Sequence, residues 1–140
     1  MVNTILVPVD DSELSERALS YAIQENPDAE FTLIHAYGLP KNAGRGAVIQ
    51  LDDEIEQAAK KGAEKVLERA RDVAAQAGYD GEIETIAQRG DPEKVITAHA
   101  EDADAVYIGS HGREGTSRIL LGSVAEKVVR RSPVPITVVK

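Results

Sequence analysis

The chain contains no cysteine. Disulfide bonds, zinc sites built on thiolates and cysteine nucleophiles are therefore excluded. No stretch approaches the ~18 consecutive apolar residues of a membrane-spanning helix. The N-terminal sequence MVNTILVPVDDSE also lacks the basic start and the long apolar run of a signal peptide. We therefore expect a cytoplasmic protein with no membrane partner.

Positive charge is also scarce. The 16 lysines and arginines are outnumbered by 24 aspartates and glutamates, which gives a net charge of −8. Proteins that bind nucleic acid through its phosphates, or that dock on anionic membranes, present a basic face, so we expect neither partner. The 140 residues suffice for one domain with one core, and we assign residues 1–140 to a single domain.

The common nucleotide-binding and hydrolytic motifs are missing as well. The P-loop pattern G-x-x-x-x-G-K-[ST] is absent, because no glycine is followed by Lys-Ser or Lys-Thr. The nearest approach to the dinucleotide pattern G-x-G-x-x-G, Gly44-Arg45-Gly46, lacks the third glycine and does not directly follow a predicted strand. Neither G-x-S-x-G nor H-E-x-x-H occurs, and we predict no catalytic residue and no metal-ligating side chain.

What the sequence does contain is an alternation of short apolar runs with segments of helical periodicity. We predict strands at residues 5–9, 31–36, 82–86, 105–108 and 133–139, and helices from 11 or 12 to about 24, at 52–77, at 92–101 and at 123–131. Alternating units of this kind predict an α/β fold, an open parallel sheet with helices on both faces. The strand at 82–86 alternates polar and apolar side chains, which is typical of a half-exposed edge strand.

The helices carry signals for their ends and faces. Asp11 or Ser12 can cap the first helix, and Asp91 precedes a proline at the first position of the third. Arg130 and Arg131 complement the dipole at the end of the last helix. In the long second helix, small and apolar residues at helical spacing predict a side that faces the core. They are Ile55, Ala58, Ala59, Gly62, Ala63, Val66, Leu67, Ala70, Val73 and Ala74.

The segment GSHGREGTSRILLGS, residues 109–123, has the composition of a ligand-binding loop. Its glycines allow positive φ and close approach of the backbone to a ligand; they are Gly109, Gly112, Gly115 and Gly122. Gly122-Ser123 opens a helix, whose free N–H groups and dipole form an anion site. The Ser123 hydroxyl can donate to a phosphate or cap the helix, and Arg113 and Arg118 can add charge. These features suit a polyphosphate; the alternative is a plain connection whose serine is only a helix cap.

The spacing in this segment, G-x2-G-x9-G-[ST], resembles the ATP-binding motif of the universal stress protein family. The sequences GSHGR, LLGSVAEKVVRRSPVPITVVK and ILVPVDDSE are also similar to that family, and the resemblance covers essentially all 140 residues. It implies a Rossmann-like, adenine nucleotide alpha hydrolase-like sheet of five strands in the order 3-2-1-4-5. It also implies a homodimer and, as in some members of the family, binding of ATP, with Mg²⁺ or Mn²⁺ dependence left open. AMP, cyclic AMP or another adenylate could use the same site.

By position, the resemblance implies a complete set of nucleotide contacts. Asp10 would lie near the ribose or a metal-linked group. The base would be bordered by Pro8, Val9 and Ala36. The sugar would lie beside Ile108 and Gly109. The phosphates would be surrounded by His111, Gly112, Gly122, Ser123, Val124 and Ala125, with Arg113 adding charge. Ala36 stands where a larger aliphatic residue is frequent, so the base pocket would be looser, and nothing is carried over for the variable segment 38–50.

Several of these residues also have simpler interpretations. Asp10 can cap the first helix or begin a turn, whether or not it also contacts a ligand. We expect His111 to be exposed, and it can be only a loop residue, just as the loop arginines can be solvated charges. His35 and His99 have no partners at ligand spacing and are interpreted as core or surface residues.

The last predicted strand raises the question of assembly. In the order 3-2-1-4-5 it is an edge strand, yet Val134 to Val139 carries no charge. An open apolar edge invites aggregation. A second copy that pairs edge to edge across a twofold axis would cover it; the alternative is cover by the chain's own loops. We predict a homodimer through residues 134–139.

Three functions are compatible with these features: a nucleotide-binding regulatory module, a slow ATP hydrolase, and a dimer that binds no nucleotide. The glycine-rich segment has no lysine to reach a γ-phosphate, and no residue is clearly placed to orient an attacking water, although Asp10 or His111 could be proposed. The intact glycine motif argues against a protein that binds no nucleotide. The sequence therefore favours an ATP-binding stress-response module with little or no turnover.

Overall fold

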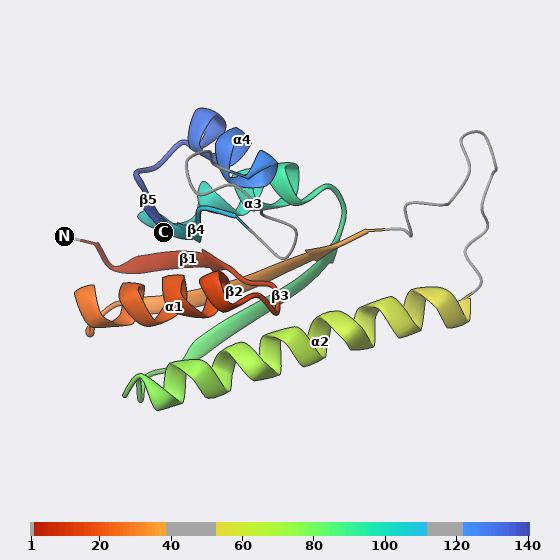
Figure 1. Ribbon diagram of the computed structural model, residues 1–140, viewed down its shortest axis with the longest axis horizontal. Helices are drawn as coiled ribbons and strands as arrows, with labels where there is room; N and C mark the ends of the chain where they lie inside the picture. The colour runs from red at the N-terminus through yellow and green to blue at the C-terminus, as the bar shows by residue number, and fades with distance from the viewer. Residues whose placement is uncertain (1, 39–52, 112–121) are drawn as a thin grey trace.

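The computed structural model of the protein describes residues 2–38, 53–111 and 122–140 (Figure 1). Within these residues the chain alternates strands and helices, as the sequence predicts. The strands are β1 (Thr4–Pro8), β2 (Glu30–Tyr37), β3 (Ile83–Arg89), β4 (Ala105–Gly109) and β5 (Ile136–Val139). The helices are α1 (Glu13–Glu25), α2 (Asp53–Gln76), α3 (Pro92–Ala100) and α4 (Ser123–Arg131).

The strands form one parallel sheet in the order β3-β2-β1-β4-β5, which confirms the predicted fold. Ile5 of β1 lies opposite Phe31 of β2 on one side and Ala105 of β4 on the other. The chain proceeds from β1 towards β3 and then crosses back to β4, so the strand order reverses between β1 and β4. In open α/β sheets, ligands bind at the carboxyl ends of the strands at such a switch point.

Helices cover both faces of the sheet: α1 and α2 lie on one face, and α3 and α4 lie on the other (Figure 1). Successive side chains of β1 point to opposite faces. Ile5 and Val7 pack in the core under α1 and α2, whereas Leu6 packs in the core under α3 and α4. Because both faces of β1 are buried, its sequence is a continuous apolar run rather than an alternation.

The first helix is capped by Ser12 rather than Asp11. Ser12 has extended backbone angles, and its Oγ accepts a hydrogen bond from the Ser15 amide at 3.2 Å. The third helix begins as predicted, with Asp91 at the N-cap and Pro92 in the first turn, although the Asp91 side chain makes no capping bond. These local signals place the beginnings of α1 and α3 next to the carboxyl ends of β1 and β3.

The prediction that α2 faces the core along its length is wrong for its amino-terminal part. Ile55 is 48% exposed, and Ala58 and Gly62 are exposed as well. The buried residues of α2 are Ala63, Leu67, Ala70 and Ala74. Figure 1 shows the first turns of α2 extending past the ends of the strands. The helical periodicity continues there, but the sheet does not.

Both edge strands differ in length from their predictions. β5 begins at Ile136, three residues later than predicted, and the segment before it pairs with β4 only through the Pro135 carbonyl, which accepts from the Val106 amide at 3.0 Å. At the other edge, β3 continues to Arg89 and pairs with β2 as far as Tyr37. The edge positions of β3 and β5 are confirmed.

Candidate functional site

A cavity of about 510 Å³ lies at the carboxyl ends of β1 and β4, at the switch point of the sheet. Its volume is within the roughly 300–1,000 Å³ of small-molecule sites. The predicted site residues that the structure describes all line it: Pro8, Val9, Asp10, Ala36, Ile108, Gly109, His111, Gly122, Ser123, Val124 and Ala125. The other two predicted residues, Gly112 and Arg113, lie outside the described residues.

The end of β1 is held in place by bonds to its neighbour β2. The Val9 amide donates to the Ile34 carbonyl at 2.9 Å. The Val9 carbonyl accepts from His35 Nδ1 at 2.7 Å, and since a carbonyl only accepts, the proton of this bond belongs to Nδ1. His35 therefore has the structural role expected of it, and it fixes the peptide that leads into Asp10.

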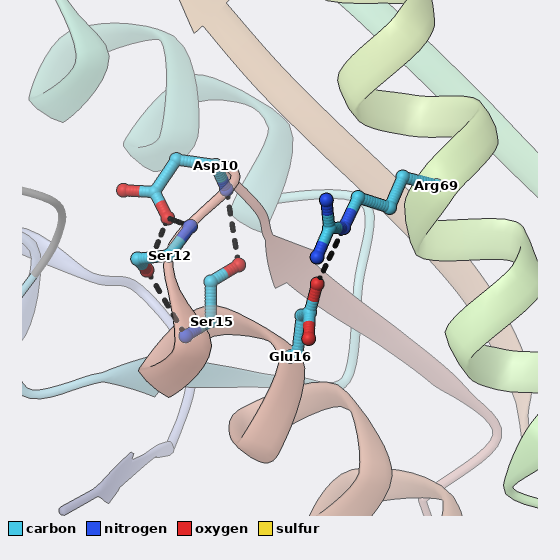
Figure 2. A network of polar contacts seen from close by, with 5 residues as sticks. All are labelled: Asp10, Ser12, Ser15, Glu16 and Arg69. Carbon is cyan, nitrogen blue, oxygen red and sulfur yellow. Dashed lines mark hydrogen bonds and ion pairs between the residues drawn. The ribbon is translucent and has the colours of Figure 1, made fainter.

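Asp10 begins a turn that is closed by two serines (Figure 2). Its Oδ1 accepts from the amide of Ser12 at 2.9 Å and also from the Ser12 hydroxyl, while the Asp10 amide donates to Ser15 Oγ at 3.0 Å. These bonds confirm the predicted turn and restrain the carboxylate. Figure 2 shows the second carboxylate oxygen of Asp10 pointing away from Ser12 and Ser15. Asp10 is thus both a turn residue and a part of the cavity wall.

Figure 2 also shows an ion pair outside this turn network. Arg69 Nε of α2 lies 2.8 Å from Glu16 Oε1 of α1. Both side chains are partly or largely exposed, and neither residue lines the cavity. The pair joins α1 to α2 on the sheet face away from α3 and α4. It contributes little to the stability of the fold, because water screens exposed ion pairs.

The two ends of the glycine-rich segment are tied to each other and to β5. The Ser110 amide donates to the Val139 carbonyl at 2.8 Å, and the Gly122 amide donates to the Ser110 carbonyl at 2.6 Å. Gly122 has φ −63°, so its role is not the positive φ that we expected. A Cβ at this position would lie 3.1 Å from His111 Cα and 3.3 Å from the Ser110 carbonyl oxygen. A side chain at this position would press against these atoms, because the two ends of the segment approach each other closely.

The helix that follows presents its amino end to the cavity. Gly122 is the N-cap of α4, and its carbonyl accepts from the Glu126 amide at 2.9 Å. The amides of Ser123, Val124 and Ala125 precede that first helical bond and have no acceptor within the helix. Since these three residues line the cavity, their N–H groups and the positive end of the helix dipole can bind an anion there. Ser123 is the first helical residue, so the alternative that it caps α4 is wrong.

The opposite part of the cavity is apolar. Ile34, Ala36, Ile96 and Ile108 line it and belong to, or pack against, the core under α3 and α4. A flat apolar group fits against such side chains, whereas an anion fits at the start of α4. The cavity therefore suits a ligand with one apolar and one anionic end.

Sequence reasoning missed five residues that line this cavity, namely Ser15, Ile34, His35, Pro92 and Ile96. Pro92 and Ile96 are four residues apart on α3, so they lie on one side of that helix. The start of α3 directly after β3 could have indicated that this helix also reaches the carboxyl end of the sheet. The structure also corrects the expected exposure of His111, which is half-buried.

The described residues contain no group of three or more histidine, aspartate or glutamate side chains arranged to hold a metal ion. In the same part of the chain, no helix combines the length and apolar character needed to cross a bilayer.

Comparisons with known proteins show which family the chain belongs to. A model of the universal stress protein family matches residues 1–140. The chain belongs to the universal stress protein family. It is 32% identical to the universal stress protein YxiE of Bacillus subtilis, with both chains covered completely.

Two solved structures of universal stress proteins carry adenine nucleotides. One is a complex with cAMP, which is 28% identical to this chain with a TM-score of 0.73 and covers 99% of this chain and 97% of its own. The other is the Archaeoglobus fulgidus protein in complex with dAMP, which is 26% identical with a TM-score of 0.65 and covers 100% and 98%. This universal stress protein thus shares its fold with relatives that bind adenylates.

Proposed function

We propose that this universal stress protein binds an adenine nucleotide, ATP, in the cavity between β1 and β4, and that it acts as a regulatory module with little or no turnover. The observation that carries the proposal is the pairing of an apolar wall with the open amino end of α4 in one cavity. The cAMP and dAMP complexes of the two related proteins support an adenylate as the ligand.

In this proposal each part of the nucleotide has its own contacts. The base lies against Pro8, Val9 and Ala36, and the ribose lies beside Ile108, Gly109 and the second carboxylate oxygen of Asp10. The phosphates accept hydrogen bonds from the amides at the start of α4, next to His111. Gly112 and Arg113 remain assigned to the phosphates from the sequence alone. A divalent cation, Mg²⁺ or Mn²⁺, would reach the site on the phosphates.

The walls of the cavity support binding rather than hydrolysis. No lysine or arginine is present among the described residues that line it, so in that part of the site the helix dipole is the positive element that faces a phosphate. One oxygen of the Asp10 carboxylate is occupied by Ser12, which restrains it as a candidate base. Neither feature supplies the positioned water and the charge stabilisation that phosphoryl transfer requires.

Calorimetry and mass analysis test this function. Nucleotide released from the purified, denatured protein is identified by mass, and ATP is titrated with and without Mg²⁺. We expect ATP binding and, in single-turnover measurements, a hydrolysis rate equal to that of the buffer control. The absence of co-purified nucleotide and of any heat up to about 1 mM ATP would contradict the proposal, and a rate well above the control would favour the hydrolase.

We also propose that two copies pair through β5. Pro135 and Val139 direct their carbonyls to β4, so the alternate residues Ile136 and Val138 direct their backbone groups to the open edge. Proline at position 138 removes one of these outward N–H groups without touching the bonds to β4. We expect sedimentation analysis to show a dimer for the natural chain and a folded monomer for Val138→Pro; a monomeric natural chain would contradict the proposal.

A further inference from the structure

The structure contains a buried carboxylate on the residue that follows Pro92 of the cavity wall. Glu93 follows Pro92 in the first turn of α3 and is only 7% exposed. Its Oε2 lies 2.9 Å from Lys127 Nζ, and its Oε1 lies 3.7 Å from Arg131 Nη1. Both cations belong to α4, which packs beside α3 in the same core (Figure 1). The carboxylate therefore joins the two helices whose first residues line the cavity.

This arrangement differs from an ordinary surface ion pair. On the same helix, Arg130 pairs with Glu126 at 3.1 Å, and both of those side chains are largely exposed. Burying a carboxylate is costly unless it is paired, and an apolar residue of similar size would often hold two helices together as well. The charged contact pairs specific atoms, however, so it restrains how α4 lies along α3. Arg131, which we expected only to complement the helix dipole, takes part in this contact.

The contact lies close to the anion site. Lys127 follows Ser123 by four residues, so the two lie on the same side of α4, one turn apart. At the start of α4, the N-cap Gly122 donates its amide to the carbonyl of Ser110, the residue after β4, and along its length α4 is bound to α3 through Glu93. These two attachments together determine where the amides of Ser123, Val124 and Ala125 point.

We infer that Glu93 is a positioning residue for the phosphate end of the cavity. It fixes the amino end of α4 through Lys127 and Arg131 and so raises the affinity for a nucleotide that it does not touch. This inference rests on the proposed nucleotide binding. It makes a distinctive prediction about whether removing the Glu93 charge strengthens or weakens nucleotide binding. If Glu93 acted only through its charge, removing that charge would strengthen the binding of an anion, whereas removing a positioning contact weakens it.

The test compares two pairs of variants by titration with ATP. Glu93→Gln and Lys127→Gln break the buried contact; Glu126→Gln and Arg130→Gln make the same changes of charge in the exposed pair on the same helix. We expect both variants of the first pair to weaken ATP binding by roughly 3- to 10-fold, although their charge changes are opposite. We expect Glu126→Gln and Arg130→Gln to change ATP affinity in opposite directions, each by less than about 2-fold. Tighter binding by Glu93→Gln would overturn the inference, as would effects equal to those of the exposed pair.

A second measurement is independent of the ligand. In the nucleotide-free protein, ¹⁵N spectra report the amides of Ser123, Val124 and Ala125. We expect these resonances to shift in Lys127→Gln, which changes a half-exposed side chain and keeps the fold, and to stay in place in Arg130→Gln. Unshifted resonances would overturn the positioning role whether or not ATP binds. Shifted resonances in a protein that binds no ATP would instead show that the proposed function has failed and that Glu93 still positions α4.

Discussion

The two faces of the sheet are built differently, and the difference explains where the site lies. On one face, α1 and the 24-residue α2 close over a core that contains Phe31, the largest of the fully buried side chains. On the other face, α3 and α4 have 9 residues each, and within the described residues they leave the carboxyl ends of β1 and β4 open to a cavity. The apolar residues of the cavity belong mainly to this second core. The closed face thus supplies the larger buried core, and the face under the two short helices carries the candidate binding site.

The largest expected effect is a loss of stability on the closed face, the face covered by α1 and α2. Phe31 is 1% exposed, and its ring packs edge-on against Tyr79 at 5.0 Å between centroids. Phe31→Ala should lower the free energy of unfolding by about 3–5 kcal/mol, measured by urea denaturation, while the ATP affinity of the folded protein stays within about 2-fold. The matched control is Val129→Ala, an exposed position on α4, which should cost less than about 0.5 kcal/mol. If Phe31→Ala kept its stability but lost ATP binding, the assignment of stability to this face and of binding to the other face would be wrong.

The next effect concerns the open face alone. Gly122→Val places a branched side chain against the backbone of Ser110 and His111, which should displace the start of α4 and reduce ATP affinity by at least ~100-fold, or about 2.7 kcal/mol. The sheet should remain folded, as judged by circular dichroism. Gly62→Ala in α2 is the control, since among the described residues no atom outside its own stretch of helix lies within 4 Å of an added Cβ; it should stabilise the helix by up to about 1 kcal/mol without changing ATP affinity. Full affinity in Gly122→Val would show that the anion site is wrongly placed.

A smaller effect is expected at Ser12, which links the closed face to the cavity. Ser12 caps α1 on the closed face and restrains Asp10 in the cavity. Ser12→Ala should therefore lower both properties, stability by about 1 kcal/mol and ATP affinity by a few fold. Ser12→Thr keeps the hydroxyl and should retain both, in thermal unfolding and in calorimetry. If Ser12→Ala lost stability with no change in ATP affinity, the turn at Asp10 would have no part in nucleotide binding.

The smallest effect lies at the opposite end of the strands. Asp104 Oδ2 accepts from the amides of Asn3 and Thr4 at 3.0 Å each, and these bonds lower the pKa of its carboxyl below the usual value. A carboxyl whose pKa is depressed by folding stabilises the protein above its unfolded pKa, and this stabilisation is lost as the pH falls through the folded pKa. Asp104→Asn should lower the melting temperature slightly at neutral pH, and the difference from the natural chain should vanish as the pH falls through the lowered pKa of the Asp104 carboxyl. ATP affinity should not change, because Asp104 does not line the cavity.

Much of the fold and of the site could be predicted because the signals are local. The helix predicted at 123–131 matches α4, since Gly122 and the following amphipathic pattern both lie within a few residues of its start. The residues assigned to the nucleotide from Pro8 to Asp10 and from Gly122 to Ala125 line one cavity. They could be predicted because the first group lies at the end of a predicted strand and the second at the start of a predicted helix. Their contact with ATP itself stays a prediction.

Other features depended on parts of the chain that are distant in sequence. The sequence by itself determined the order of strands and helices, the end of the sheet at which a ligand would bind, and the chemistry of the helix start, since these follow from periodicity and composition over a few residues. Only the tertiary structure decided that Ile55 is exposed, that Pro92 and Ile96 line the same cavity as Asp10, and that Glu93 pairs with Lys127 and Arg131. A local pattern states which side of an element is apolar or charged, but the partner that side meets is set by how separate elements pack together.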